Sequence, residues 1–396
     1  MASIVRSRTL ILSAAVMCAS GACSLDETGK PDNTVSLQVY QNVLPPAVDP
    51  YVIEKGAVFG RDQGDDTYLW INPSPHCVAD DGNLYVLDAR QTKAYIMTPQ
   101  GELLRTFGKK GQGPGEFSVL QDLTLFEGHL YTNDPFNRRV TVMDTEGKYL
   151  SSHTFPLDVP TSRFLIPYRF SDGCGYILIE KDHRYPHVIG ERSRAHFAVH
   201  RLSETLTIES TLYDSTGTFE FIRIAGENRS RPLDNLTPVT GLAPGMPVAW
   251  SYGKQFRVDF LDPANGDRWA VRIPHEALPM SQTFRERLIE SYARLTRSSI
   301  ERARRITYPD RLPHVDSMMS DLQWDPAGRL WVREFRDPTI SGTPYRFQVF
   351  SRSGEWLFRQ DLPVHPILFS ADGFYARGEA ADGSPLVQFY QFMPRR

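Results

Sequence analysis

The chain has 396 residues, of which 41% are hydrophobic and 23% are charged, so it can bury a large core. Its formal net charge of −3 excludes the strongly basic character that is usual for nucleic-acid-binding proteins. Aromatic residues make up 11% of the chain, a composition typical of sheets that pack face to face.

The N-terminal segment predicts export. Arg6 and Arg8 precede a short apolar stretch, residues 10–19, that is too short to span a bilayer. Small residues lead from this stretch to Cys23, and the segment resembles the signal of a bacterial lipoprotein. We expect removal of residues 1–22 and lipid attachment at Cys23. A soluble export signal, cut at the same place, is the alternative.

A loose polar segment, residues 23–34, follows and predicts a tether. A phrase then recurs, in which a glycine precedes a strand of alternating apolar and aromatic residues. It begins at Gly82, Gly128 and Gly328. Units of roughly 40–50 residues that consist of strands are the sequence signature of a β-propeller. We therefore predict an all-β protein, a propeller formed by residues 35–396.

Six blades, with seven as the alternative, are expected from the strand patterns, at residues 74–107, 123–155, 169–212, 248–273, 322–358 and 367–390. The last of these has only three strands. We expect residues 35–40 to supply its missing outer strand, because strands from both ends of the chain would then close the ring and remove open sheet edges.

Two segments interrupt the repeats. Residues 213–247 are rich in Gly, Pro, Asn and Arg and predict a long loop. Residues 275–310 form an insertion before the fifth blade, and its part from 281 to 306 is expected to be helical. Ser281 is a plausible N-cap there, and apolar residues recur at helical spacing. The insertion holds the one local concentration of arginines, and we expect it to pack against the propeller rather than to dock a partner or anionic lipid.

Several segments resemble NHL-repeat and related bacterial six-bladed β-propeller proteins. Residues 108–117 are similar to the loop between blades in that family. Residues 134–140 resemble its phrase in which an Asp precedes Asn-Arg and a strand, and residues 325–332 and 350–354 fit the same family. The resemblance implies the fold and often a lipoprotein signal. It implies no single activity.

The two cysteines outside the signal, Cys77 and Cys174, fall in blades that are not neighbours. Pairing would need their Cα atoms to lie within about 7 Å, so we expect two free, buried thiols. Asp88 and Asp134 end second strands, and we expect them to cap the turns that follow.

Two acids fall at comparable places on the inner strands of opposite blades, Asp122 in blade two and Asp321 in blade five. Calcium needs about 6–8 oxygen ligands, so these two are too few for a metal site. His76, on the inner strand of blade one, and His314 or His365 could join them. Ordinary hydrogen bonding at the mouth of the channel is the favoured interpretation, and a catalytic carboxylate or histidine site is the alternative.

Arginines near the strand ends, Arg138, Arg169 and Arg333 among them, could together attract an anionic ligand, a glycan or an acidic patch of a partner. Isolated exposure of each arginine is the simpler expectation. The chain has no nucleophile elbow, no zinc-spaced Cys/His cluster and no dinucleotide fingerprint, so we predict neither a cofactor nor a catalytic residue.

These observations favour a binding or scaffold protein of the bacterial cell envelope, held by lipid on its periplasmic or outer-membrane face. A protein, peptide or glycan would be its ligand. Secretion as a soluble protein is the alternative location. The alternative function is an enzyme with a site in the central channel, either a metal-dependent hydrolase or lactonase, or a lyase.

Overall fold

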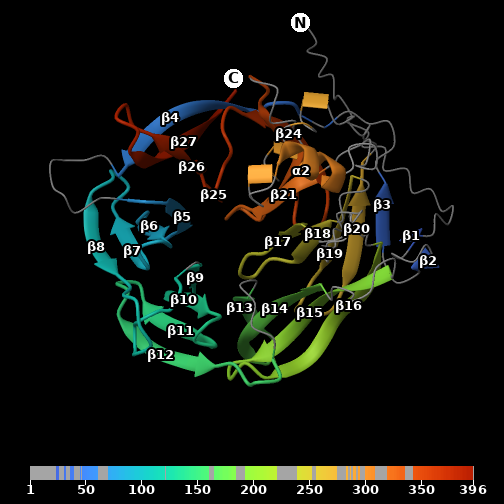
Figure 1. The fold of residues 1–396 in the computed structure, drawn as a ribbon, viewed down its shortest axis with the longest axis horizontal. Coiled ribbons are helices and arrows are strands. Elements are labelled where there is room, and N and C mark those ends of the chain that lie inside the picture. Colours follow the sequence, from blue (N-terminus) through green and yellow to red (C-terminus); the bar gives the residue numbers. More distant parts are fainter. Residues whose placement is uncertain are drawn as a thin grey trace, which may run out of the picture.

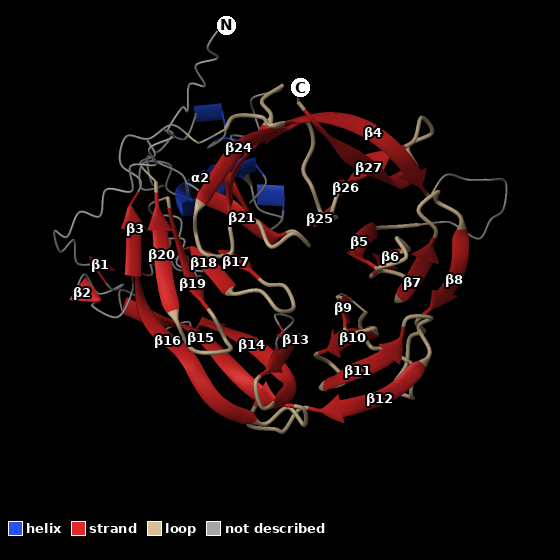
Figure 2. Cartoon of the chain, turned by 180° about the vertical axis from the view of Figure 1, so that it is seen from behind, coloured by secondary structure: helices blue, strands red, loops and turns tan. Residues whose placement is uncertain are grey.

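The computed structural model shows six sheets arranged radially in a ring, a six-bladed β-propeller (Figures 1 and 2). The predicted fold class is thereby confirmed. The structure describes residues 47–60, 70–120, 122–159, 165–183, 192–220, 239–251, 256–273, 299–307, 319–334 and 342–395, together with 24–25, 31–32, 36–39, 45 and parts of 282–294. The predicted signal peptide and Cys23 lie outside these residues.

The first three blades follow one another along the chain, each from its inner strand to its outer strand. Blade one has β5 (Pro73–Val78), β6 (Leu84–Asp88), β7 (Lys93–Met97) and β8 (Leu103–Phe107). Blade two has β9 (Thr124–Phe126), β10 (His129–Asp134), β11 (Arg139–Asp144) and β12 (Tyr149–Thr154). Blade three has β13 (Leu165–Phe170), β14 (Gly173–His183), β15 (Arg192–Ser203) and β16 (Ile208–Glu220).

The last three blades complete the ring, and segments from the N-terminal region add strands to two of them. Blade four has β17 (Val239–Gly241), β18 (Val248–Ser251), β19 (Arg257–Leu261), β20 (Arg268–Arg272) and β3 (Ser36–Val39). Blade five has β21 (Met319–Trp324), β22 (Leu330–Glu334), β23 (Tyr345–Phe350) and β24 (Trp356–Leu362). Blade six has β25 (Leu368–Phe369), β26 (Gly373–Glu379), β27 (Pro385–Pro394) and β4 (Tyr51–Phe59). A separate pair, β1 (Ser24–Leu25) and β2 (Pro31–Asp32), precedes them.

Apolar packing between neighbouring blades holds the ring together. Each of the six seams contains a cluster of buried side chains drawn from both of its blades. The middle strands carry most of this packing: every residue of β6 is buried, whereas β8, at the outer edge of the same blade, is mostly exposed. The alternating, aromatic-rich middle strands were therefore the part of each repeat that was easiest to predict from the sequence.

The strand that closes the ring is β4, not the predicted segment at residues 35–40. β4 pairs with β27 in antiparallel register, from Tyr51 opposite Pro394 to Phe59 opposite Val387. Residues 36–39 form β3, which instead adds in parallel to the outer strand β20 of blade four. The kind of closure was predicted correctly and its donor wrongly. β4 sits at an outer edge and faces solvent over much of its length, so its sequence lacks a strong apolar alternation.

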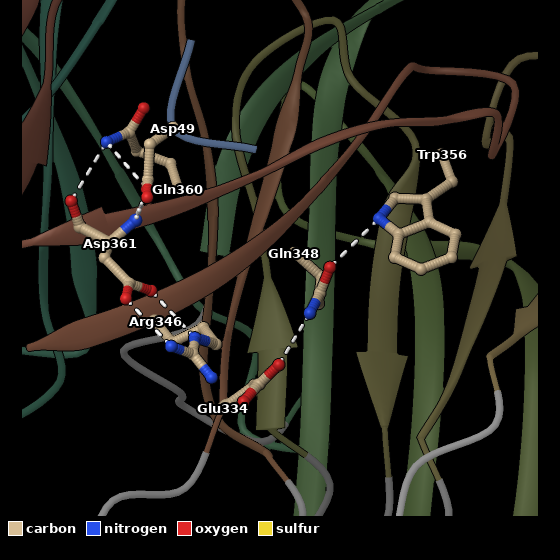
Figure 3. Close-up of polar contacts among 7 residues, drawn as sticks. All are labelled: Asp49, Glu334, Arg346, Gln348, Trp356, Gln360 and Asp361. Atoms are coloured by element: carbon tan, nitrogen blue, oxygen red, sulfur yellow. Dashed lines mark hydrogen bonds and ion pairs between the residues drawn. The ribbon is translucent and has the colours of Figure 1, made fainter. Parts of the chain in front are cut away.

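A hydrogen-bonded staple continues this closure onto blade five (Figure 3). Asp49 accepts a hydrogen bond from the backbone N–H of Asp361 at 2.7 Å and one from Gln360 at 3.3 Å. The Asp361 carboxylate in turn accepts two bonds from the guanidinium of Arg346, at 2.8 and 2.9 Å. The segment around Asp49 is thus hydrogen-bonded to β24, the outer strand of blade five, immediately before the chain enters blade six as β4.

The predicted long loop at residues 213–247 is wrong at both of its ends. β16 continues to Glu220, and the inner strand of blade four, β17, begins at Val239. Only residues 221–238 of that segment lie outside the described residues. β17 is only three residues long, which is too short for a periodic signal to develop.

The described part of the insertion before blade five is helical, as expected. It includes α2 (Ile300–Thr307), and Arg304 of this helix pairs with Glu286 at 2.7 Å. Ile289 and Ala293 are buried together, while the apolar residues that carried the prediction, Phe284, Leu288, Tyr292 and Leu295, lie outside the described residues. None of the described helices combines the length and the apolar character that crossing a bilayer requires.

Asp88 and Asp134 cap the following turns, as predicted, and also clamp the chain that enters their own blades. Asp88 is fully buried and accepts hydrogen bonds from the backbone N–H groups of Ile71 and Asn72, at 2.6 and 3.1 Å, as well as from Gln91. Asp134 is equally buried and plays the same part in blade two, where the N–H of Ser118 donates at 2.7 Å. These aspartates are part of the repeat and fix its loops.

Candidate functional site: the central channel

The ring encloses a cavity of about 1220 Å³ at its centre. All six blades contribute to the wall, mainly through the ends of the inner strands and the turns that follow them. We call this the turn end of the channel, and the opposite end, where the inner strands begin, the start end. The wall residues used below are His76, Asp80, Asp81, Arg105, Leu123, Leu125, Glu127, Glu146, Leu242, Ala243, Leu322, Trp324, Asp325, Leu368 and Phe369.

The wall combines half-buried apolar side chains, Leu125, Leu242 and Leu368, with acidic residues of the turns. Four further wall residues are almost fully buried in the seams between blades: Leu123, Leu322, Trp324 and Phe369. The indole N–H of Trp324 is buried and has no hydrogen-bond acceptor within the described part of the chain. Five acidic residues line the cavity, and Arg105 is its one lysine or arginine within the described ranges.

Of the six channel and rim residues predicted from the sequence, His76 lies in the cavity wall. Its Nδ1 is 2.9 Å from the carbonyl oxygen of Ser74, so the ring is held against its own strand, with Nδ1 as the protonated nitrogen of the neutral ring. The neighbouring Cys77 is a free thiol, and burial raises its pKa to about 12. A thiol held protonated in this way is a weak nucleophile.

Asp122 is bound within its own blade. Its Oδ1 accepts hydrogen bonds from the hydroxyl of Thr132 at 3.1 Å and from the backbone N–H of Asn133 at 2.9 Å. Burial raises the pKa of this carboxyl to about 6, although both hydrogen bonds favour the charged form. Asp122 therefore ties the segment that enters β9 to the neighbouring strand β10.

Asp321 belongs to a polar cluster at the start end, between blades five and six. Gln323 donates a hydrogen bond to its Oδ2 at 2.6 Å, and the Nε2 of His365 lies 3.6 Å from the same oxygen. Arg333 lies opposite Asp321 in the strand register. Burial lowers the pKa of the guanidinium of Arg333, and Asp321 opposes this shift. Burial also lowers the pKa of His365, and the charge of Arg333 adds to that effect.

The predicted channel residues therefore do not form one site. Asp321, Arg333 and His365 lie near one another in blades five and six, whereas Asp122 has its hydrogen-bond partners within its own blade two, across the ring. His314 lies outside the described residues. Within the described ranges, no three His, Cys, Asp or Glu side chains are grouped so that they could hold a metal ion.

The remaining predicted arginines bind neighbouring groups of the propeller. Arg138 donates to the carbonyl oxygens of Pro156 and Val159, at 2.6 and 3.1 Å, and so fixes the loop that leaves blade two. Arg169 forms a two-pronged ion pair with Glu127 at the mouth of the cavity. They do not converge into a single basic rim.

Sequence analysis missed the wall residues that set the charge of the mouth, Asp80 and Asp81. Both lie in the turn after the inner strand of blade one and are exposed. Aspartate is so common in such turns that its type carries no functional signal. Only the arrangement of six turns around one opening gives these charges a shared location.

Comparison with known proteins supports the fold. A family model described as a 6-bladed beta-propeller matches residues 65–177, which span blades one and two and the beginning of blade three. The predicted resemblance to bacterial six-bladed propellers is confirmed. No curated protein sequence matches the chain.

The chain is similar to several solved structures at low sequence identity. A member of the DUF4221 family from Bacteroides vulgatus is 10% identical, with a TM-score of 0.51 over 87% of this chain and 98% of its own. A protein of Bacteroides fragilis that is described as a candidate exported protein is 12% identical, with a TM-score of 0.48 over 90% and 100%. Virginiamycin B lyase from Staphylococcus aureus is 10% identical, with a TM-score of 0.38 over 87% and 100%. Likeness at these identities extends to the fold alone.

Proposed function

We propose that this protein is an exported, membrane-anchored propeller that binds a protein, peptide or glycan ligand at the turn end of its central channel. The observation that carries the proposal is the cavity of about 1220 Å³, which all six blades line. Binding sites of proteins are typically concave and combine apolar with polar groups, and the wall of this cavity contains both kinds of residue. The rigid seams between the blades hold its wall in place.

Residues 1–22 are its proposed signal peptide, Cys23 its lipid-bearing residue and residues 23–34 its tether. The apolar stretch, the small residues and the following cysteine support this assignment. Mass spectrometry of the protein extracted from membranes tests it. We expect a mature N-terminus at Cys23 with acyl chains attached, and loss of membrane association in Cys23→Ser. An unmodified N-terminus in the soluble fraction would favour the secreted alternative.

Filling the cavity tests the binding function. Ala243 lines the cavity, and Ala264 lies in an exposed turn elsewhere on blade four. Libraries of peptides and oligosaccharides would be screened for thermal stabilisation of the wild type, of Ala243→Trp and of the matched control Ala264→Trp. We expect ligands that stabilise the wild type and the control but not Ala243→Trp. Ligands that stabilise all three equally would place the binding site elsewhere.

An enzyme remains the second candidate because Asp321 and His365 form a carboxylate–imidazole pair at 3.6 Å beside Arg333. Such a pair can act as a general base if substrate reaches the imidazole. Screening for lactone hydrolysis and for lyase activity tests this candidate. Activity that disappears in Asp321→Asn, while ligand binding at the turn end persists, would establish it.

A further inference from the structure

We infer that the ligand of the turn end is a basic peptide segment, in which lysine or arginine stands next to apolar side chains. The inference rests on the proposed binding function and adds the chemistry of the ligand. It follows from the pairing of charges along the wall, from the half-buried apolar residues on the same wall and from the size of the cavity.

Three of the five acidic wall residues already have a cation. Glu146 pairs with Arg105 at 2.9 Å, Glu127 pairs with Arg169, and the buried Asp325 pairs with Arg329 at 2.6 Å. These pairs leave two acids, Asp80 and Asp81, which form no ion pair with any described residue.

The turn that carries these two acids needs only one of them. Asp81 caps the turn, since its Oδ1 accepts the backbone N–H of Asn83 at 2.9 Å and its Oδ2 accepts the amide of the same residue at 2.7 Å. Asp80 makes no side-chain hydrogen bond or ion pair within the described residues, and it is exposed. A structural role therefore accounts for Asp81 and leaves the carboxylate of Asp80 without one.

Charge and shape together select the ligand. Carboxylates at the mouth of a cavity with low-dielectric walls attract cations and repel anions. On the same wall, the half-buried Leu125, Leu242 and Leu368 offer apolar surface to an uncharged side chain. A ligand that matches both features carries positive charge beside apolar groups.

The size of the cavity favours a peptide. Pockets for drug-sized ligands usually measure about 300–1,000 Å³, and this cavity of about 1220 Å³ exceeds that range. Several residues of an extended segment fit such a space. A neutral glycan would fill it without using the charge of Asp80 and Asp81.

Titration calorimetry with three probes tests the inference: the peptide acetyl-Leu-Lys-Leu-Lys-amide, its Leu-Glu-Leu-Glu counterpart and maltoheptaose. The variant Asp80→Asn/Asp81→Asn removes the two charges and keeps side-chain oxygens for the turn. The matched control, Asp267→Asn/Asp382→Asn, removes two turn charges that do not line the cavity.

We expect the lysine peptide to bind the wild type and the control alike, and to bind Asp80→Asn/Asp81→Asn roughly three- to tenfold more weakly. Added salt should weaken binding to the wild type more than binding to that variant. The inference is overturned by equal affinity of the lysine peptide for the wild type and Asp80→Asn/Asp81→Asn, by preference for the glutamate peptide or maltoheptaose, or by lack of binding of the lysine peptide.

The cavity-filling variant Ala243→Trp separates this inference from the proposed function. If the glutamate peptide or maltoheptaose binds the wild type but not Ala243→Trp, the channel remains the binding site and only its charge preference is wrong. If the lysine peptide binds both proteins equally, the channel is not the site, and both proposals are wrong.

Discussion

Blades two and five carry an aspartate at comparable places of the repeat, yet the two residues meet different surroundings. Asp122 is satisfied within blade two, by Thr132 and Asn133 of the neighbouring strand. Asp321 lies beside Arg333 and reaches toward His365 in the segment that enters blade six. The position in the repeat fixes where the carboxylate stands. The charge of its neighbours decides whether it acts as a strand link or as part of an ionic cluster.

The ends of the second strands differ in the same way. Blade two ends its second strand with the buried Asp134, which clamps two loops. Blade five has Glu334 at the corresponding end, and this side chain accepts a hydrogen bond from Gln348, which in turn accepts the indole N–H of Trp356 (Figure 3). Blade five has thus exchanged a loop clamp for polar contacts within its own sheet.

Removal of the clamp should have the largest effect. Asp134→Ala would leave the N–H groups of Ser118 and Asn137 without their acceptor, and we expect the free energy of unfolding to fall by about 3 kcal/mol. Glu334→Ala should cost about 1 kcal/mol, because one side-chain amide loses a partner. Equilibrium unfolding in guanidinium chloride measures both changes. Equal losses would show that Asp134 and Glu334 stabilise the fold to the same extent.

Asp122→Asn should stabilise the protein at neutral pH by about 2 kcal/mol. The folded pKa of Asp122, about 6, lies above the ordinary value of 3.8. As the pH rises from about 4 to 6, the unfolded chain therefore loses this proton before the folded protein does, and wild-type stability falls. The asparagine keeps its acceptor oxygen for Thr132 and Asn133 and does not titrate.

Thermal unfolding of the wild type and Asp122→Asn between pH 4 and 7.5 checks this expectation. The gap in melting temperature should widen as the pH rises and become constant above the folded pKa. A gap that is the same at every pH would mean that the variant acts through packing and not through the ionisation of Asp122.

The same substitution in blade five should have the opposite sign. Asp321→Asn removes the carboxylate that faces the partly buried guanidinium of Arg333, and we expect a loss of about 1 kcal/mol near neutral pH. The double variant Asp321→Asn/Arg333→Gln should recover part of this loss, because it also removes the positive charge of Arg333 that the carboxylate of Asp321 faces in the wild type. Guanidinium unfolding of the single and double variants gives the coupling. Additive losses would contradict an interaction between the two side chains.

The contrast between the blades explains what the sequence could predict. Middle strands such as β6 are buried along their whole length, so their apolar pattern is strong, and six blades could be counted from it. The closing strand β4 lies at a solvent-facing edge, where Glu54, Lys55 and Gly56 interrupt the pattern. Its pairing with β27 depends on a partner more than 300 residues away in sequence, as in the bond from Gln388 to the carbonyl of Gly56.

The candidate site was predictable only in part for the same reason. The repeat predicted corresponding positions for Asp122 and Asp321. The hydrogen bonds that Asp122 accepts from Thr132 and Asn133, and the approach of His365 to Asp321, arise from packing between strands and could not be predicted from it. Asp80 and Asp81 gave an ordinary turn signal. Their importance follows from the charges that neighbouring blades contribute to the same opening, which no single repeat contains.

The smallest expected effect is a shift in the pKa of His365, which should have opposite signs in variants of Arg333 and of Asp321. Burial and the positive charge of Arg333 lower this pKa, and the negative charge of Asp321 raises it. The pKa should therefore rise in Arg333→Gln and fall further in Asp321→Asn. Titration of the His365 ring by NMR measures both shifts, and His129, the exposed first residue of β10 in blade two, serves as the control that neither variant should move. Shifts of the same sign in both variants would mean that burial alone sets the pKa and that blade five holds no ionic cluster.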